Sequence, residues 1–177
     1  VTFHPKPKDG DWNGSGLHTN YSTTLMRYTN GYKYMEEAIN RLNENHLEHM
    51  AVYGKDNKMR MTGKQETSSW DKFTWGVSDR TASIRIPRQC YVEQCGYIED
   101  RRPGSNANPY DVCVALANTT VMDSDSYKSY DASPDIPLSF GGVVESGIEN
   151  RKVRMTGFGE SHEIDVLDVI SEEGVKK

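Results

Sequence analysis

A short polar segment near the beginning of the chain has the residue types of a ligand-binding loop. Trp12–Arg27 reads WNGSGLHTNYSTTLMR, and within it Gly14 and Gly16 flank Ser15. Glycine has no Cβ atom, so the backbone there can approach a bound ligand closely. His18 follows directly and is a candidate metal ligand. For two glycines and one histidine alone, a glycine turn before a polar loop is the ordinary interpretation.

A second group of charged residues lies on segments that alternate like β-strands. In Thr81–Arg88 the apolar residues share one face, so Arg85 lies on the polar face. In Tyr97–Arg102, Glu99 and Arg101 share one face by the same rule. Guanidinium groups bind carboxylates and phosphates through paired hydrogen bonds. The clustered basic residues are Arg80, Arg85, Arg88, Arg101 and Arg102. This local clustering predicts that any bound polyanion is small.

The bulk composition predicts a soluble protein of one domain's length. The chain has 177 residues, 35% of them hydrophobic, and a mean hydropathy of −0.76. No apolar run approaches the roughly 20 residues that cross a bilayer. The net charge of −5 argues against nucleic acid as a partner. Cys90, Cys95 and Cys113 are too few for a disulfide scaffold, which favours free thiols and the cytoplasm, with the first two in a loop.

Four segments resemble, in the expected order, the motifs of eukaryotic-type glutamine synthetases. WNGSGLHTNYST follows VTFHPKP, and the later segments read RMTGKQETS, GVSDRTASIRIPR and GYIEDRRPGSNANPY. Four motifs in register over about 125 residues make chance similarity improbable. The resemblance fades after about Tyr130. It implies the C-terminal part of the family's catalytic domain.

The resemblance implies ATP-dependent ligation of ammonia to glutamate through γ-glutamyl phosphate, with Mg²⁺ or Mn²⁺ as cofactor. Phosphoryl transfer depends on positioning and charge neutralisation, so such a site needs divalent cations and guanidinium groups. The roles that motif matches imply are metal binding for His18 and Glu99, substrate binding for Asn13, Gly14, Arg60 and Arg101, nucleotide binding for Arg80 and Arg85, and catalysis for Glu66 and Arg80. His18 and Glu99 would serve two different ions.

Glu66 matches the glutamate of a flap that closes over the site. A closing carboxylate can keep water from an acyl phosphate and take a proton from ammonium. The chain departs from the family at two positions: Gln65 stands where the family has histidine, and His4 where it has aspartate. The first departure bears on substrate contact by the flap.

The predicted fold class is α+β, an antiparallel sheet with covering helices, like part of the glutamine synthetase catalytic domain. The predicted elements are a strand at Val1–Pro7, a helix at Gly31–Tyr53, an exposed and mobile loop at Gly54–Ser69, strands within Thr81–Arg88 and Tyr97–Arg102, and a helix capped by Asn108. His46 and His49 are interpreted as packing or surface histidines. Arg80 and Arg85 have opposite parity, so facing one cleft with Arg101 requires a bulge or strand start between them.

Two regions are expected, residues 1–130 and an atypical tail, 131–177, with a linker at 122–137. Arg154–Gly157 repeats the sequence of Arg60–Gly63, and seven identities in nineteen positions suggest a partial copy of the 55–73 loop segment. Ile164–Ile170 is a candidate strand of the tail.

Two alternatives stay open: a catalytically inactive relative kept as a structural or regulatory subunit, and an ATP-guanidino phosphotransferase. The resemblance also implies a homo-oligomeric ring with active sites between neighbouring subunits. A chain that begins with Val1 is interpreted as processed, excised or incomplete. The isolated chain is therefore expected not to make glutamine, because its matched metal ligands are one histidine and one glutamate.

Overall fold

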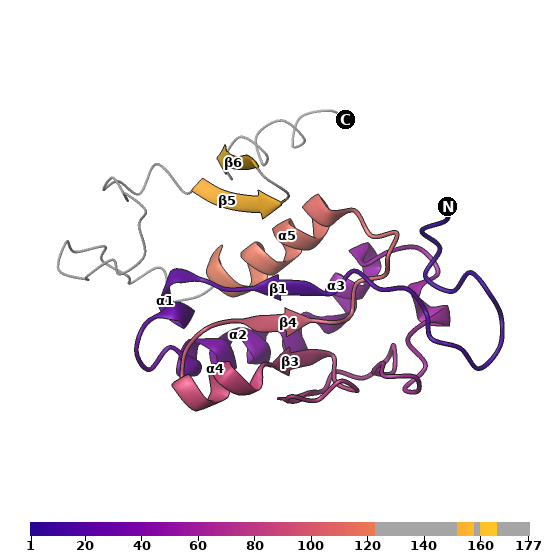
Figure 1. Cartoon of the computed structure of the whole chain (residues 1–177), viewed down its shortest axis with the longest axis horizontal. Coiled ribbons are helices and arrows are strands. Elements are labelled where there is room, and N and C mark those ends of the chain that lie inside the picture. The colour runs from indigo at the N-terminus through magenta and orange to yellow at the C-terminus, as the bar shows by residue number, and fades with distance from the viewer. Residues whose placement is uncertain (123–151, 158–159, 166–177) are drawn as a thin grey trace. The chain divides into compact units, whose positions relative to one another are not determined.

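The computed structural model of the chain describes residues 1–122, 152–157 and 160–165 (Figure 1). The chain consists of two units, Val1–Tyr130 and Asp131–Lys177. The strands of the first unit are β1 (Thr19–Tyr21), β2 (Trp75–Val77), β3 (Ile84–Ile86) and β4 (Ile98–Asp100). Its helices are α1 (Thr24–Arg27), α2 (Tyr32–Glu44), α3 (His46–Val52), α4 (Arg88–Glu93) and α5 (Pro109–Ala117), with a 3₁₀ turn η1 (Asn57–Met59) and a π-helical turn η2 (Asn118–Met122).

The sheet of the first unit is mixed, with the strand order β1-β4-β3-β2. β4 pairs antiparallel with β1 and β3, whereas β2 runs parallel to β3. The combination of sheet and helices is compatible with the α+β class, but the prediction of an antiparallel sheet is wrong at β2. Parallel strands usually need a connection of a dozen or more residues. Here residues 78–83 suffice, because backbone amides of Thr74 and Ser83 each donate to the other's hydroxyl at 3.2 Å.

One face of this sheet packs on the helices. Ile84, Ile86 and Ile98 are fully buried, since strand alternation directs them to the same side. They join one core cluster with residues of α2 and α5, among them Met35, Ile39, Leu42, Val112 and Leu116. The helical spacing of Met35, Ile39 and Leu42 thus places them on one buried face of α2. The residues between these isoleucines point to the opposite face of the sheet.

The predicted helix at Gly31–Tyr53 consists of two helices, because the helical conformation is interrupted at Asn45. The Asn45 backbone has φ −102° and ψ 20°, and its side-chain amide donates to the carbonyl of Arg41 at 2.9 Å. α3 therefore starts afresh at His46. Both histidines of α3 are buried, at 6% exposure for His46 and 3% for His49. Their interpretation as packing residues is confirmed.

Three other predicted boundaries are wrong. Val1–Pro7 forms no strand, and Pro5 and Pro7 have no amide hydrogen with which to join a sheet. The loop Gly54–Ser69 is not exposed throughout, since Asn57, Arg60, Met61 and Ser68 are buried. Cys90 lies in α4 rather than in a loop, although all three thiols are free as predicted.

The end of the first unit follows the sequence signals closely. The Asn108 side chain caps α5 by accepting from the Tyr110 amide, with Pro109 in the first turn. None of the helices in the described part of the chain is long and apolar enough to cross a membrane. The linker predicted at 122–137 lies almost wholly outside the described residues.

In the second unit, β5 (Lys152–Gly157) and β6 (Glu160–Asp165) form an antiparallel pair. The repeated sequence at Arg154–Gly157 is thus a strand, whereas Arg60–Gly63 follows the turn η1. The candidate strand at Ile164–Ile170 is described only at residues 164 and 165, which end β6. The repeat in sequence is not a repeat in backbone conformation.

Candidate functional site

A row of polar residues crosses the sheet on the face opposite the helices. Glu99 on β4 pairs with Asn20 on β1 and with Arg85 on β3. Residues directly opposite each other in an antiparallel pair point to the same face. His18 lies two residues before Asn20, and Arg101 two residues after Glu99, so both share that face. Three strands from distant parts of the chain therefore bring four predicted site residues together.

The Glu99 carboxylate is the centre of this group. Its side chain is only 8% exposed. Oε1 lies 3.2 Å from both His18 Nδ1 and Arg101 Nη1, and Oε2 lies 2.5 Å from Arg85 Nε. A carboxylate so far removed from water needs compensating positive charge. The two guanidinium groups supply it.

His18 completes the group, with its side chain 37% exposed. Burial lowers the pKa of His18, the charge of Arg101 lowers it further, and the neighbouring carboxylate of Glu99 opposes both. Its Nδ1 atom also lies 3.4 Å from Arg101 Nη1. The neutral imidazole is the form that binds metal ions.

The donor atoms of this group fit a divalent cation in kind but not in number. Histidine nitrogen and carboxylate oxygen are both ligands of Mn²⁺, and Mg²⁺ prefers oxygen. Among the described residues, however, no three histidine, cysteine, aspartate or glutamate side chains gather into a metal site. His18 and Glu99 alone leave most of an octahedral sphere to other ligands. The structure brings the two predicted ligands together, with His18 Nδ1 3.2 Å from Glu99 Oε1.

Two nitrogen atoms in the group are suited to an anion. Arg85 Nε and Arg101 Nε are buried and make no hydrogen bond within the described residues. Arg85 Nε is close to Glu99, but its N–H does not point at the carboxylate oxygen. A buried N–H without an acceptor is costly, so such groups are normally satisfied by a ligand or water. Phosphate or carboxylate oxygens would satisfy both.

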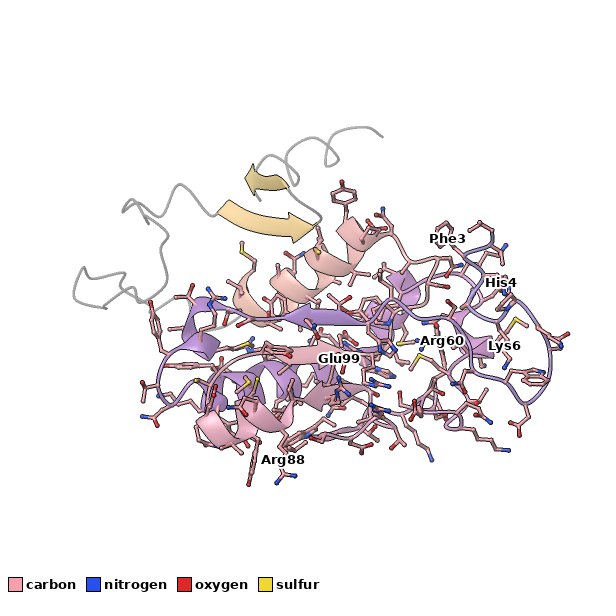
Figure 2. All side chains as sticks on the ribbon, in the orientation of Figure 1. Phe3, His4, Lys6, Arg60, Arg88 and Glu99 are labelled. Atoms are coloured by element: carbon pink, nitrogen blue, oxygen red, sulfur yellow. The ribbon has the colours of Figure 1, made fainter. Side chains whose placement is uncertain are left out.

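Arg60 lies beside the glycine-rich loop. Figure 2 shows it between Glu99 and the N-terminal segment that carries His4 and Lys6, whereas Arg88 lies apart on α4. A Cβ atom on Gly14 would lie 2.3 Å from Arg60 Cγ, and one on Gly16 2.9 Å from Arg60 Nη1. Glycine is therefore required at both positions for this approach. The structure thus brings Gly14 and Arg60 together, and Asn13, the neighbour of Gly14 in the chain, is exposed.

Arg60 is buried with only 4% exposure, and backbone carbonyls hold it. Its Nη2 atom donates to the carbonyls of Arg101, Arg102 and Pro103 at 3.2, 2.6 and 3.1 Å. Burial and the charge of Arg101 lower the pKa of Arg60 to about 10, so it stays charged at neutral pH. The guanidinium is fixed in place at the edge of the polar face.

Replacing Gly14 with alanine is expected to lower the free energy of unfolding by about 1–3 kcal/mol, the usual cost of overpacking. The added methyl group would meet Arg60 Cγ and, at 2.6 Å, the carbonyl oxygen of Pro5. Neither can move freely, because Arg60 is held by three carbonyls. Urea unfolding followed by circular dichroism measures the loss, with the exposed neighbour Ser15→Ala as control. Equal stability of the two variants would mean that the loop relaxes around the methyl group.

The tip of the loop after Arg60 carries Glu66. Gln65 and Glu66 have φ values of 54° and 58°, and Thr62 bridges to Ser69, so the segment is a tight turn. The Glu66 carboxylate is exposed and lies 3.6 Å from Arg80 Nη1. Arg101 Nη2 donates to the backbone carbonyls of Glu66 at 3.2 Å and Arg80 at 2.8 Å.

Arg101 thus connects the turn and the β2–β3 connection to the central group. Arg80 contributes its carbonyl to Arg101, while its own side chain is 66% exposed and lies beside the Glu66 carboxylate. Gln65 Nε2 donates to Asp11 Oδ1 at 2.9 Å, which ties the turn to the N-terminal loop instead of to the central group.

A hollow of about 600 Å³ lies apart from the central group, none of whose residues line it. It is lined by the N-terminal loop and the turn, namely Lys6, Asp9, Gly10, Asp11, Trp12, Met59, Thr62, Lys64 and Gln65. We assign the candidate site to the charged row, namely His18, Arg85, Glu99 and Arg101. Open hollows between surface loops are common in proteins and do not by themselves indicate a function.

Sequence reasoning missed a buried polar network behind β4. Asp100 and Arg102 are both fully buried and joined by Nε–Oδ1 and Nη2–Oδ2 contacts of 2.9 and 2.8 Å. The Tyr53 hydroxyl donates to Asp100 Oδ2 at 2.8 Å. Arg102 Nη1 lies 3.2 Å from His46 Nδ1, and Arg102 Nη2 lies 3.4 Å from His49 Nδ1. The signal was present, since Asp100 and Arg102 share the parity of the buried Ile98.

Comparison with known proteins follows the motifs. No model of a protein family matches the chain. Glutamine synthetase of Suillus bovinus is 54% identical over 123 residues, which is 70% of this chain and 35% of the relative. That of Tuber borchii is 57% identical over 119 residues, 67% of this chain and 33% of the relative. "Glutamine synthetase 1, mitochondrial" of Drosophila melanogaster is 50% identical over 127 residues, 70% of this chain and 32% of the relative.

The chain therefore spans about one third of the length of the curated relatives that it matches. The resemblance inferred from the four motifs is confirmed. Over about 70% of its length, this chain is similar to the glutamine synthetases and corresponds to part of such a protein.

Proposed function

We propose that this chain supplies part of an active site that ligates ammonia to glutamate at the expense of ATP, giving glutamine through γ-glutamyl phosphate. The observation that carries the proposal is the row of His18, Arg85, Glu99 and Arg101 on one sheet face. It lies in the segment that is 50–57% identical to proteins named glutamine synthetase. Because the matched segment is one third of those relatives, the complete site is proposed to include further residues.

Arg60 is proposed to bind a carboxylate of glutamate, with Asn13 and Gly14 beside it. Two of its three nitrogen atoms, Nε and Nη2, already donate to Asn57 and to backbone carbonyls. Nη1 faces the space that Gly16 leaves open next to the His18 ring. A fixed cation with one N–H-bearing edge available suits an anionic group of a small substrate.

The phosphate groups of ATP are proposed to meet Arg85 and Arg101. Their buried Nε–H groups, which make no hydrogen bond within the described residues, offer donors where negative charge passes from nucleotide to glutamate. Donors fixed in advance stabilise a transition state without reorganising. When Mg²⁺ or Mn²⁺ ions are bound, His18 and Glu99 would each hold a different one, and the cations would neutralise phosphate charge. The exposed side chain of Arg80 is proposed to approach the phosphates from the β2–β3 connection.

Glu66 is proposed to close the site and take a proton from ammonium. Its position on an exposed turn, linked to Arg101 through the backbone, supports this role. The amide of Gln65 carries no charge, so substrate contact by this position would be limited to hydrogen bonding. The proposal also includes a cytoplasmic homo-oligomer. The name of the Drosophila melanogaster relative states a mitochondrial location for that protein.

A segment exchange tests the proposal. The matched segment of the Suillus bovinus glutamine synthetase is replaced by the corresponding 123 residues of this chain. The chimera should form γ-glutamyl hydroxamate from glutamate, hydroxylamine, ATP and Mg²⁺, and the Glu99→Gln chimera should not. Exposed Glu36→Gln is the matched control. A folded chimera without activity would instead support the alternative of a catalytically inactive relative, which the intact charged row argues against.

In the active chimera, Glu66→Ala should lower the rate of amide formation by at least about tenfold, or 1.4 kcal/mol. Affinity for the nucleotide should change much less, since the proposed work of Glu66 is closure and proton removal. Steady-state kinetics together with nucleotide titration separate the two. Equal losses in rate and affinity would point to a structural role for Glu66.

A further inference from the structure

We infer that Asn57 is a positioning residue for Arg60. Its buried amide fixes the guanidinium so that the Nη1 edge is presented to the polar face. The inference rests on the proposed function in one respect, namely that Arg60 binds glutamate. The contacts between the two side chains stand independently of that role.

The Asn57 side chain is fully buried and can adopt one orientation. Its Nδ2 atom donates to the carbonyls of Arg102 at 2.7 Å and Tyr53 at 3.1 Å. Its Oδ1 atom accepts from Arg60 Nε at 2.9 Å. A flipped amide would place its oxygen against two carbonyls and its NH₂ against the Arg60 N–H. The acceptor is therefore held toward Arg60.

The local backbone makes the two side chains neighbours. Asn57 begins the 3₁₀ turn η1, and the Arg60 amide donates to its carbonyl at 3.0 Å. In such a turn, residues three apart lie on the same side. A Cβ atom on Gly104 would lie 3.0 Å from Asn57 Oδ1, so the chain after β4 also comes close.

Together these contacts leave Arg60 one way to face. Asn57 holds Nε, and three carbonyls of the Arg101–Pro103 segment hold Nη2. Nη1 is left toward Gly16 and His18. The carbonyls alone would let the guanidinium tilt about Nη2, because a second fixed point is needed to set its plane. Asn57 supplies that point.

Arginine modification by phenylglyoxal in the full chain tests the inference, with each arginine quantified by mass spectrometry. In Asn57→Ala, the modification rate of Arg60 should rise about fivefold, as expected from loss of one buried hydrogen bond. The rates for Arg85 and Arg102 should stay within about twofold by the same estimate. Asn106→Ala, which removes an exposed amide bond to the Lys55 carbonyl, is the matched control. An equal rise at Arg102 would show general loosening and overturn the inference.

Asn57→Asp should restore slow modification of Arg60, since the acceptor oxygen remains while the donors are lost. Fast modification in a folded Asn57→Asp chain would contradict the positioning role. If neither variant folds, hydrogen exchange of the Arg60 Nε proton in the unsubstituted chain decides. It should be slower than that of the exposed Arg88, and equal exchange would overturn the inference.

Glutamate separates this inference from the proposed function. In the unsubstituted chain, millimolar glutamate should slow modification of Arg60, and it should do so less in Asn57→Ala. If glutamate gives no protection while the Asn57 variants still change the Arg60 rate, the glutamate-binding role of Arg60 fails and its positioning by Asn57 stands.

Discussion

Asp100→Asn is expected to lower the free energy of unfolding by about 3–5 kcal/mol, the cost of breaking a buried ion pair by removing one partner. Arg102 is fully buried, and its charge is balanced by Asp100 at 2.8 Å. Burial alone would raise the pKa of Asp100, but the charge and hydrogen bonds of Arg102 outweigh it, so the pKa lies below its ordinary value. An asparagine would keep the shape and leave the guanidinium uncompensated.

Urea unfolding followed by circular dichroism measures the loss, with exposed Asp9→Asn as the control. The double variant Asp100→Asn/Arg102→Met should be less destabilised than the sum of its two single variants, because it removes the stranded charge. A loss below about 1 kcal/mol for Asp100→Asn would mean that water reaches Arg102 and that the pair behaves like a surface one.

The second large effect is acid destabilisation between pH 6.5 and about pH 4, centred on His49. Burial lowers the pKa of His49 to about 4, and the charge of Arg102 adds to this. Below pH 6.5, His49 therefore binds a proton in the unfolded chain but stays neutral in the native state. The contribution of His49 to the free energy of unfolding is therefore fully present above pH 6.5. It decreases as the pH falls, and below about pH 4 it decreases no further. The shift is worth about 3 kcal/mol.

The surroundings of His49 explain why it stays neutral. Its ring nitrogens lie 2.8 Å from the Tyr53 hydroxyl and 2.7 Å from Thr119 Oγ1, with Arg102 and His46 nearby. Burial lowers the pKa of His46 as well, which adds a loss of the same sign. His49→Gln should flatten the dependence of stability on pH, whereas the half-buried His4→Gln should not. An unchanged slope in His49→Gln would place the acid sensitivity elsewhere.

The sequence predicted the central group well because alternation is a local rule. Glu99 and Arg101 share one face of the sheet by parity. The isoleucines of β3 share the opposite face, which enters the core. The motifs supplied His18, since a residue before a strand has no periodicity of its own. Which strand lies beside which is a long-range matter, and no local rule gave the parallel pairing of β2 with β3.

The errors have identifiable physical causes. The apolar spacing continues through Asn45, so periodicity could not reveal that its side chain ends α2 by bonding the Arg41 carbonyl. The polar composition of 54–69 suggested an exposed loop, but Asn57 and Arg60 are buried because backbone carbonyls satisfy them.

The strand order has a consequence for how the chain reaches this structure. β4 occupies an interior position between β1 and β3, yet it is the last of the four strands to leave the ribosome. Until then β1 and β3 have no common neighbour, and pairing of β1 requires closing a loop that spans most of the first unit. Such distant pairing slows folding, because loop entropy is lost before contacts compensate. During synthesis, the charged row should therefore assemble in a single late step.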